Sequence, residues 1–169
     1  VGRGRRAGRG EGNCAGGWGG RGGGGGQDRR WRDGIGTPKE LREFWDAAGG
    51  TLPQGKRISF GENLWMVPED MPALKGLKVL RAGLELGQLL KNRFEPAHAL
   101  ALWLKESASQ VDYPVDAPEI AAYLSGNTIP GTQTGWTLLK VDGLSLGWTK
   151  GSNGVLKNHF PKGLRRTLR

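Results

Sequence analysis

Residues 135–160 read GWTLLKVDGLSLGWTKGSNGVLKNHF, and this stretch decides the fold. It contains two dipeptides, Asp142-Gly143 and Asn153-Gly154, that favour two-residue turns between antiparallel strands. Apolar and polar residues alternate on both sides of the first dipeptide, as a half-buried sheet requires. The stretch therefore predicts consecutive antiparallel strands close to the end of the sequence.

The first turn fixes a predicted register. A two-residue turn pairs three residues before it with three residues after it, and the pairs would form one apolar face. These pairs are Val141–Leu144, Leu139–Leu146 and Thr137–Trp148. Because Trp148 continues this apolar face, we expect its side chain to lie in the core.

The second turn would place Lys150 opposite Lys157, and Trp148 opposite His159. Two lysines that face each other across strands repel, and an anion lying over them would relieve the repulsion. A lysine-rich edge strand that prevents aggregation is the alternative interpretation. Three further bases follow at once, which an edge strand does not need: Lys162, Arg165 and Arg166.

Rings beside several bases are typical of surfaces that bind RNA by stacking and phosphate contacts. The candidate RNA-binding residues are those of the last strand and its continuation, with two bases that precede the main predicted helix. They are Lys150, Lys157, Asn158, His159, Lys162, Arg165, Arg166, Lys91 and Arg93. For Lys91 and Arg93 a solvated connector is the alternative.

The earlier part of the chain mixes short helices with strands. Helical spacing and turn residues predict helices within 37–50, 95–106 and 116–127. A hairpin is expected over 56–70, and one long strand or two short ones over 77–90. The fold class is therefore α+β: a small, partly open β-barrel with two or three short helices.

The domain is predicted to cover 37–169, because residues 1–36 hold 16 of the 31 glycines. Such a Gly/Arg-rich segment buries too little apolar surface to offset its backbone entropy, and we expect disorder. It resembles segments that bind RNA loosely, but a bare linker and an ill-chosen gene start are equally open.

The net charge of +9 lies at the two ends of the chain. Residues 1–36 carry +5, residues 37–139 carry −2 and residues 140–169 carry +6. This separation indicates a polyanionic partner, with nucleic acid favoured over a membrane surface.

Several kinds of chemistry find no support in the sequence. Cys14 is the only cysteine, and the two histidines, His98 and His159, are far apart. We therefore expect no metal site, no catalytic residue and no cofactor in this chain. The chain also lacks an apolar run of membrane-spanning length, so a cytoplasmic, monomeric protein is the expectation.

Two segments carry a family resemblance: GENLWMVPEDMPALKGLKVLRAGLELGQLLKNRFEPAHALAL, residues 61–102, and GWTLLKVDGLSLGWTKGSNGVLKNHFPKGLRR, residues 135–166. Together they resemble the C-terminal, PUA-like RNA-binding region of bacterial RsmF-like ribosomal RNA cytosine-5 methyltransferases of the Nop/Sun family. The resemblance covers about residues 38–166. It implies a small β-barrel with accessory helices that presents structured, ribosomal RNA to a catalytic domain.

Members of that family carry an upstream domain that binds S-adenosylmethionine and uses two cysteines. Neither cysteine motif occurs here, so the resemblance implies that the catalytic half is missing: the chain is a fragment, or a partner chain supplies it. The alternative function is a protein-interaction domain that docks on a separate methyltransferase or a ribosomal partner. Its apolar patch would include Trp45, Trp65 and Trp103.

Overall fold

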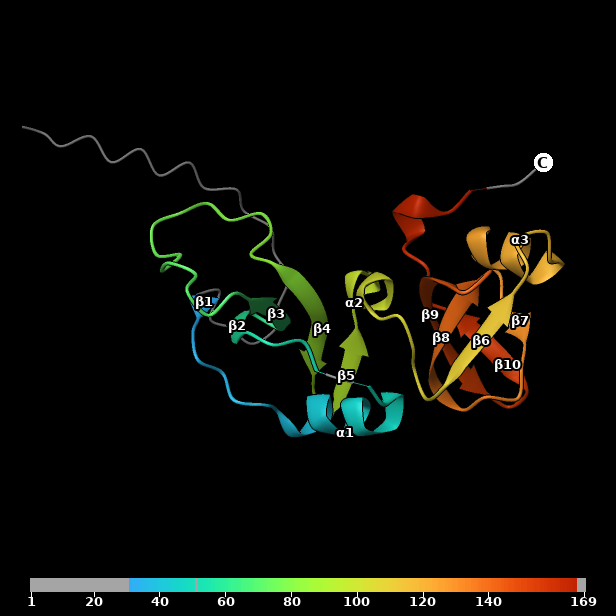
Figure 1. Cartoon of the computed structure of the whole chain (residues 1–169), viewed down its shortest axis with the longest axis horizontal. Helices are drawn as coiled ribbons and strands as arrows, with labels where there is room; N and C mark the ends of the chain where they lie inside the picture. Colours follow the sequence, from blue (N-terminus) through green and yellow to red (C-terminus); the bar gives the residue numbers. More distant parts are fainter. Residues whose placement is uncertain (1–30, 51, 167–169) are drawn as a thin grey trace, which may run out of the picture.

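Two five-stranded sheets lie side by side in the computed structural model, which describes residues 31–50 and 52–166 (Figure 1). The first sheet is an antiparallel meander in which each strand pairs with the next along the chain. Its strands are β1 (Trp31–Arg32), β2 (Lys56–Phe60), β3 (Asn63–Val67), β4 (Leu84–Leu90) and β5 (Arg93–Pro96).

The second sheet has the order β6-β8-β9-β10-β7, with β6 parallel to β8 and the other pairs antiparallel. Its strands are β6 (Gln110–Tyr113), β7 (Ile129–Pro130), β8 (Gly135–Val141), β9 (Leu144–Ser152) and β10 (Val155–Asn158). They curl into a half-barrel. The helices are α1 (Lys39–Ala48), α2 (His98–Trp103) and α3 (Pro118–Leu124), and a 3-10 turn, η1, spans Lys162–Leu164.

The predicted α+β class, the partly open barrel and the short helices are confirmed. The hairpin expected over 56–70 is β2–β3, and all three predicted helices are present. Of the strand expected over 77–90, only the part after Gly83 is formed, as β4. Leu77 and Leu80, which precede it, are 63% and 85% exposed, so they have no apolar surface to pack against.

The first sheet begins earlier than predicted. Trp31 and Arg32, assigned from sequence to the disordered segment, pair with β2. The ring of Trp31 lies 5.1 Å from that of Phe60, so this aromatic residue gives the strand an apolar contact that its glycine-rich surroundings do not suggest. Residues 1–30 of the predicted disordered segment, which include Cys14, lie outside the described residues.

A bulge in the β8–β9 hairpin shifts its register by one residue. The pair next to the turn is Val141–Leu144, as predicted, but the register shifts between Leu139 and Lys140. Leu146 is left as the extra residue. Because side chains alternate between the faces of a sheet, one extra residue changes which side chains share a face.

The two outer predicted pairs, Leu139–Leu146 and Thr137–Trp148, are wrong for this reason. Leu138 lies opposite Trp148 instead, and Trp136 lies opposite Lys150. The turn itself is as predicted, since the residue at its first position, Asp142, has a φ of 46°. The error thus comes from the bulge and not from the turn.

Gly147 stands beside the bulge because a larger residue would not fit there. A β-carbon at Gly147 would overlap with the hydroxyl group of Tyr123. That hydroxyl donates a 2.9 Å hydrogen bond to the carbonyl oxygen of Trp148. Burial raises the pKa of Tyr123, so its hydroxyl keeps the proton that it donates.

The two sheets share one core at their junction. Trp148, predicted to be a core residue, is 1% exposed, and its indole N–H donates a 3.0 Å hydrogen bond to the carbonyl oxygen of Ala97, which precedes α2. Its ring meets that of Phe44 on α1 edge-on, with centroids 5.6 Å apart. Residues of both sheets, α1 and α2 belong to this cluster. The single-domain boundary of 37–169 stays a prediction.

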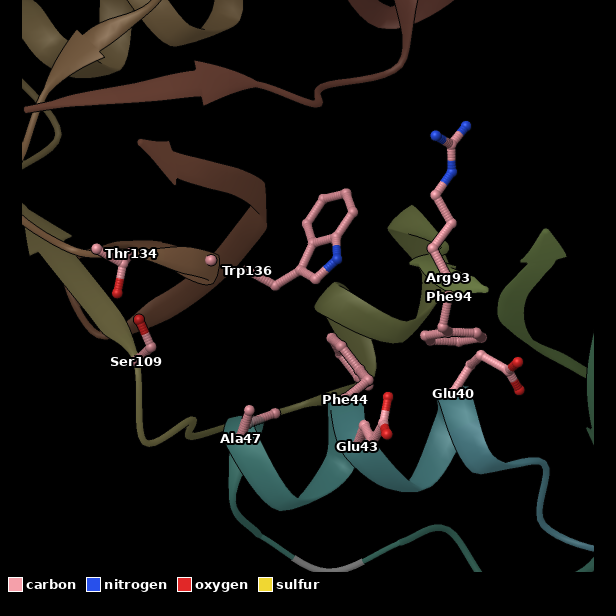
Figure 2. A pocket seen from close by; sticks show the side chains of 11 residues that line it. Glu40, Glu43, Phe44, Ala47, Arg93, Phe94, Ser109, Thr134 and Trp136 are labelled. Carbon is pink, nitrogen blue, oxygen red and sulfur yellow. The ribbon is translucent and has the colours of Figure 1, made fainter. Parts of the chain in front are cut away.

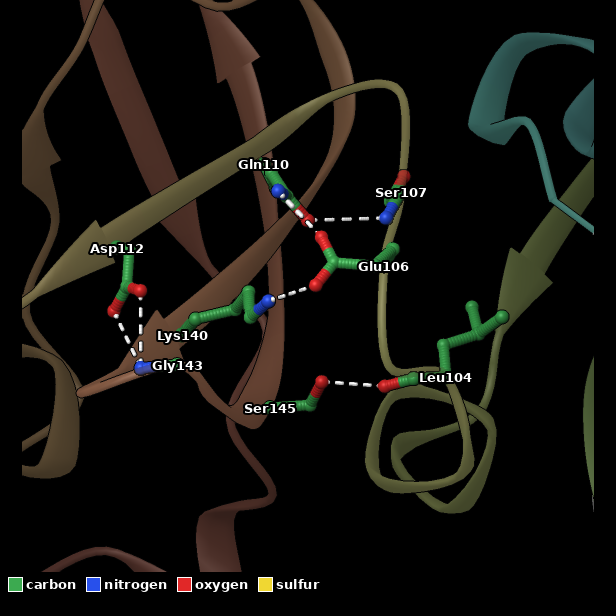
Figure 3. A network of polar contacts seen from close by, with 8 residues as sticks. All are labelled: Leu104, Glu106, Ser107, Gln110, Asp112, Lys140, Gly143 and Ser145. Carbon is green, nitrogen blue, oxygen red and sulfur yellow. Dashed lines mark hydrogen bonds and ion pairs between the residues drawn. The ribbon is translucent and has the colours of Figure 1, made fainter.

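Polar contacts also fix the connection between the sheets (Figure 3). Lys140, which is 5% exposed, donates a 2.8 Å hydrogen bond to Glu106, and the Nε2 of Gln110 donates one of 2.7 Å to the same carboxylate. The hydrogen bond from Lys140 is the main cause of a lowered Glu106 pKa. Nearby, the hydroxyl of Ser145 donates to the carbonyl oxygen of Leu104. The connecting segment is thereby tied to the β8–β9 hairpin.

The Gly147→Ala substitution should lower the free energy of unfolding by about 2 kcal/mol, because the added methyl group displaces the Tyr123 hydroxyl from its hydrogen bond. Urea denaturation measures this change. Gly163→Ala is the matched control, since nothing lies within 4 Å of a β-carbon there. Equal stability of the two variants would show that Gly147 is not required for packing.

Candidate nucleic-acid interface

Three side chains form a row across β8, β9 and β10. Trp136 lies opposite Lys150, and Lys150 lies opposite Lys157, so all three share one face of the sheet. The predicted pairing of the two lysines is confirmed, with Asn153 at the turn in a positive-φ conformation of 54°. Both lysines are exposed. The Nζ of Lys150 lies 5.1 Å from the centroid of the Trp136 ring, a cation–π distance.

His159 completes this group, which we call the basic row: Trp136, Lys150, Lys157 and His159. The predicted neighbour relation with Trp148 holds, since the backbone N–H of His159 donates to the Trp148 carbonyl oxygen. The imidazole meets the indole of Trp136 edge-on, with centroids 4.5 Å apart. The row therefore presents two rings and two ammonium groups together.

Burial, and to a smaller extent the nearby charges, shift the pKa of His159. Partial burial lowers the pKa below its ordinary value, and the charges of Lys150 and Lys157 lower it further. Glu95 on β5 has the opposite effect. The first sheet thus faces the basic row of the second sheet through this carboxylate.

Arg93 and Lys91 come from the β4–β5 hairpin of the first sheet. The Nε of Arg93 lies 3.2 Å from a carboxylate oxygen of Glu95, and both side chains are partly or fully exposed. Arg93 also lines a pocket that includes Trp136. Lys91 is exposed in the turn, beside Asn92 with its φ of 57°. Of these two bases, Arg93 is the one that the structure brings close to the basic row.

Two of the predicted contact residues, Asn158 and Arg165, make hydrogen bonds within the protein. The amide nitrogen of Asn158 donates to the carbonyl oxygens of Tyr123 and Asn127, at 2.7 and 2.9 Å. Its amide oxygen accepts from the N–H of Phe160. The guanidinium of Arg165 donates twice to the carbonyl oxygen of Phe160, at 3.2 Å each. These groups position the end of β10 and the segment after it.

The remaining two bases, Lys162 and Arg166, are exposed near the end of the described chain. Lys162 begins η1, and the backbone N–H of Arg166 donates to the carbonyl oxygen of Leu124 on α3. Since α3 covers the opposite face of the second sheet, Arg166 lies away from the basic row.

A pocket of 290 Å³ adjoins the basic row (Figure 2). One wall is α1, with Glu40, Glu43 and Phe44; β5 contributes Arg93 and Phe94, and the start of β8 contributes Trp136. Trp136 therefore belongs both to the pocket and to the basic row.

Trp136 is the residue that sequence reasoning missed. The predicted register placed it away from Lys150, and only the bulge brings the two opposite each other. Its partial exposure separates it from Trp148, which is buried below it with ring centroids 6.4 Å apart. A partly exposed tryptophan in a basic setting is the signal that could have identified it.

The histidines do not form a metal site. His98 begins α2, and its ring packs edge-on against Phe160 at 5.4 Å, which lowers the pKa of His98 by burial. Among residues 31–50 and 52–166, no group of three or more His, Cys, Asp or Glu side chains is placed to hold a metal ion. In the same part of the chain, no helix has the length and apolarity needed to cross a membrane.

Comparison with known families agrees with this geometry. Residues 110–166, the second sheet with α3, match the family described as the methyltransferase RsmF PUA domain. Residues 43–104, which run from α1 to the end of α2, match the RsmF rRNA methyltransferase first C-terminal domain. The chain therefore belongs, over residues 43–166, to the C-terminal region of the RsmF methyltransferase family, as the sequence resemblance predicted.

Two similar proteins carry the same name, ribosomal RNA small subunit methyltransferase F. The protein from Aeromonas hydrophila is 28% identical over 130 residues, and that from Shewanella loihica is 29% identical over 133 residues. Each match covers 75% of this chain and 27% of the relative. The chain thus spans about a quarter of the length of these relatives.

The pKa of His159 should report the arrangement of the basic row without any ligand. Lys150→Gln and Lys157→Gln should each raise this pKa, because each removes a charge that disfavours the imidazolium; Glu95→Gln should lower it. Titration of the imidazole resonances by NMR measures the shifts. Lys78→Gln, at an exposed lysine between β3 and β4, is the control. An unchanged His159 pKa in all three test variants would contradict the arrangement.

Proposed function

We propose that this chain is the RNA-binding region of a ribosomal RNA cytosine-5 methyltransferase, and that the basic row binds structured ribosomal RNA. The observation that carries the proposal is the alignment of Trp136 with Lys150 and Lys157 on one face of the sheet, where both lysines are exposed. The membership of residues 110–166 in the PUA family supports it independently.

Repulsion between the two lysines favours the binding of an anion. Lys150 and Lys157 face each other directly, and within the described residues neither makes an ion pair. Their mutual repulsion costs stability in the free protein. Phosphate groups of RNA bound at the two lysines remove this cost, and counterions are released from the RNA.

The two rings of the basic row add contacts that phosphate binding alone does not provide. Trp136 and His159 offer aromatic surface beside the lysines, on which unpaired bases can stack. Lys91, Lys162 and Arg166 add positive charge at a greater distance, and Asn158 and Arg165 act by positioning β10. The surface is thus suited to loops or bulges of folded RNA.

Methyl transfer belongs, in this proposal, to a catalytic domain outside the described residues that binds S-adenosylmethionine in the same polypeptide or in a separate chain. The names of the two relatives as methyltransferases support such a division. The two sheets act as one RNA-presenting unit, since a shared core joins them. The cytoplasm is the compartment we propose.

Docking on another protein is the second candidate function. Leu102 and Trp103 on α2 are 56% and 46% exposed, so α2 presents an apolar surface. Of the other tryptophans predicted for such a patch, Trp65 is buried and Trp45 is half-buried. Concentration-dependent sedimentation of the chain without RNA, abolished by Trp103→Ser, would favour this function.

The double substitution Lys150→Gln with Lys157→Gln should weaken binding of the full chain to a ribosomal RNA stem–loop at every salt concentration. The slope of log affinity against log salt should fall in magnitude by about 2, about 1 for each lost phosphate contact. A filter-binding or fluorescence-anisotropy titration over a salt series measures both quantities.

The same double variant should be as stable as the parent chain or slightly more stable, because it removes a like-charge pair. Lys78→Gln with Lys105→Gln, at two exposed lysines outside the basic row, is the matched control for net charge. If both double variants weaken binding equally, net charge and not the basic row is responsible, and the proposed surface is wrong.

A further inference from the structure

One wall of the pocket beside the basic row carries charges opposite in sign to those of the row. Its α1 wall carries Glu40 and Glu43, which lie three residues apart and hence on one face of the helix. The basic row presents ammonium groups, whereas the α1 wall of the pocket presents carboxylates. A phosphate group is attracted by the first and repelled by the second, so the pocket is suited to another part of an RNA molecule.

Planar groups border the pocket. Figure 2 shows the indole of Trp136 and the guanidinium of Arg93 on two sides of the opening, with Phe44 below. Phe44 and Phe94 pack together with centroids 5.1 Å apart and form an apolar floor. The ion pair with Glu95 orients the guanidinium of Arg93. Flat aromatic and guanidinium surfaces are the groups on which unstacked bases lie in protein–RNA complexes.

The carboxylates supply hydrogen-bond acceptors at the pocket wall. Glu43 pairs with Lys39 at 3.5 Å, but both side chains are exposed, at 64% and 77%, so the pair is weak and Glu43 can accept from another donor. Ligand pockets typically range from about 300 to 1,000 Å³. At 290 Å³, this one has room for a ligand of the smallest class, such as one base.

We propose that this pocket receives one unpaired nucleobase that carries an amino group, from the RNA whose phosphates lie on the basic row. The base stacks on Trp136, and its amino group donates to Glu40 or Glu43. Guanine, adenine and cytosine have such a group; uracil has only its ring N3–H, which is flanked by two carbonyl oxygens that the carboxylates would repel. This inference rests on the proposed RNA binding and adds to it a selection against uracil.

The test uses the full chain and an RNA stem–loop with a single bulged nucleotide. With 2-aminopurine at the bulge, binding should quench its fluorescence through stacking on Trp136. Trp136→Leu should abolish the quenching. When the bulged nucleotide is varied among the four ordinary bases, the RNA with uracil should bind about tenfold more weakly than the RNA with guanine. This difference is within the range for one specific base contact.

The double substitution Glu40→Gln with Glu43→Gln tests the pocket separately from the basic row. Its result does not depend on how Trp136 packs. It should reduce the discrimination against uracil to less than threefold, while the salt dependence of binding stays as in the parent chain. Asp46→Asn, at an exposed carboxylate of α1 that does not line the pocket, is the control and should keep the discrimination.

The outcomes distinguish the two proposals. If the stem–loop does not bind at low salt, both the proposed function and this inference fail. If it binds through Lys150 and Lys157 but the bulged base is neither quenched nor selected, only the base pocket is wrong. Quenching that persists in Trp136→Leu also overturns the pocket, because the base would then stack elsewhere.

Discussion

The indole of Trp148 is the contact on which the arrangement of the two sheets depends. It stands on β9, donates its N–H to Ala97 ahead of α2 and meets Phe44 of α1 edge-on. A buried indole N–H without a partner is costly, so this hydrogen bond restricts how the second sheet can lie against the helices. Because α1 carries Glu40 and β8 carries Trp136, the pocket between them exists only in this arrangement.

A second constraint acts within the second sheet. The bulge at Leu146 moves Trp136 opposite Lys150, which places an aromatic ring in line with both lysines. Tyr123, from α3 on the other face, occupies the space that Gly147 leaves beside the bulge. The core on one face of the sheet thus determines which side chains meet on the opposite face.

The parts that could be predicted are those encoded by neighbouring residues. Asp142-Gly143 and Asn153-Gly154 fix their turns through local backbone preference, so the pairing of Lys150 with Lys157 follows from the sequence. The bulge could not be predicted, because it depends on Tyr123, which lies more than twenty residues away along the chain. Trp136 was missed for the same reason.

Which of the candidate contact residues face solvent also could not be predicted from the sequence. Residue type alone does not distinguish a base that faces solvent from one that caps carbonyl groups, so Arg165 and Lys157 are equivalent in the sequence. In the structure, the guanidinium of Arg165 is committed to the carbonyl oxygen of Phe160, whereas Lys157 is exposed. The pocket was beyond sequence reasoning, because its walls come from α1, β5 and β8, which tertiary packing alone brings together.

The opposed lysines are the place where this fold departs from a rule of strand pairing. Two other charged groups in or near the second sheet have partners: buried Lys140 has Glu106, and Arg165, after η1, has a carbonyl oxygen. Sequences that are consistent at most positions tend to break local rules at functional sites. Asn158 fixes the end of β10 through three hydrogen bonds, and so keeps Lys157 opposite Lys150 despite their repulsion. The strand therefore holds two like charges together, and this is the arrangement that the proposed phosphate binding would use.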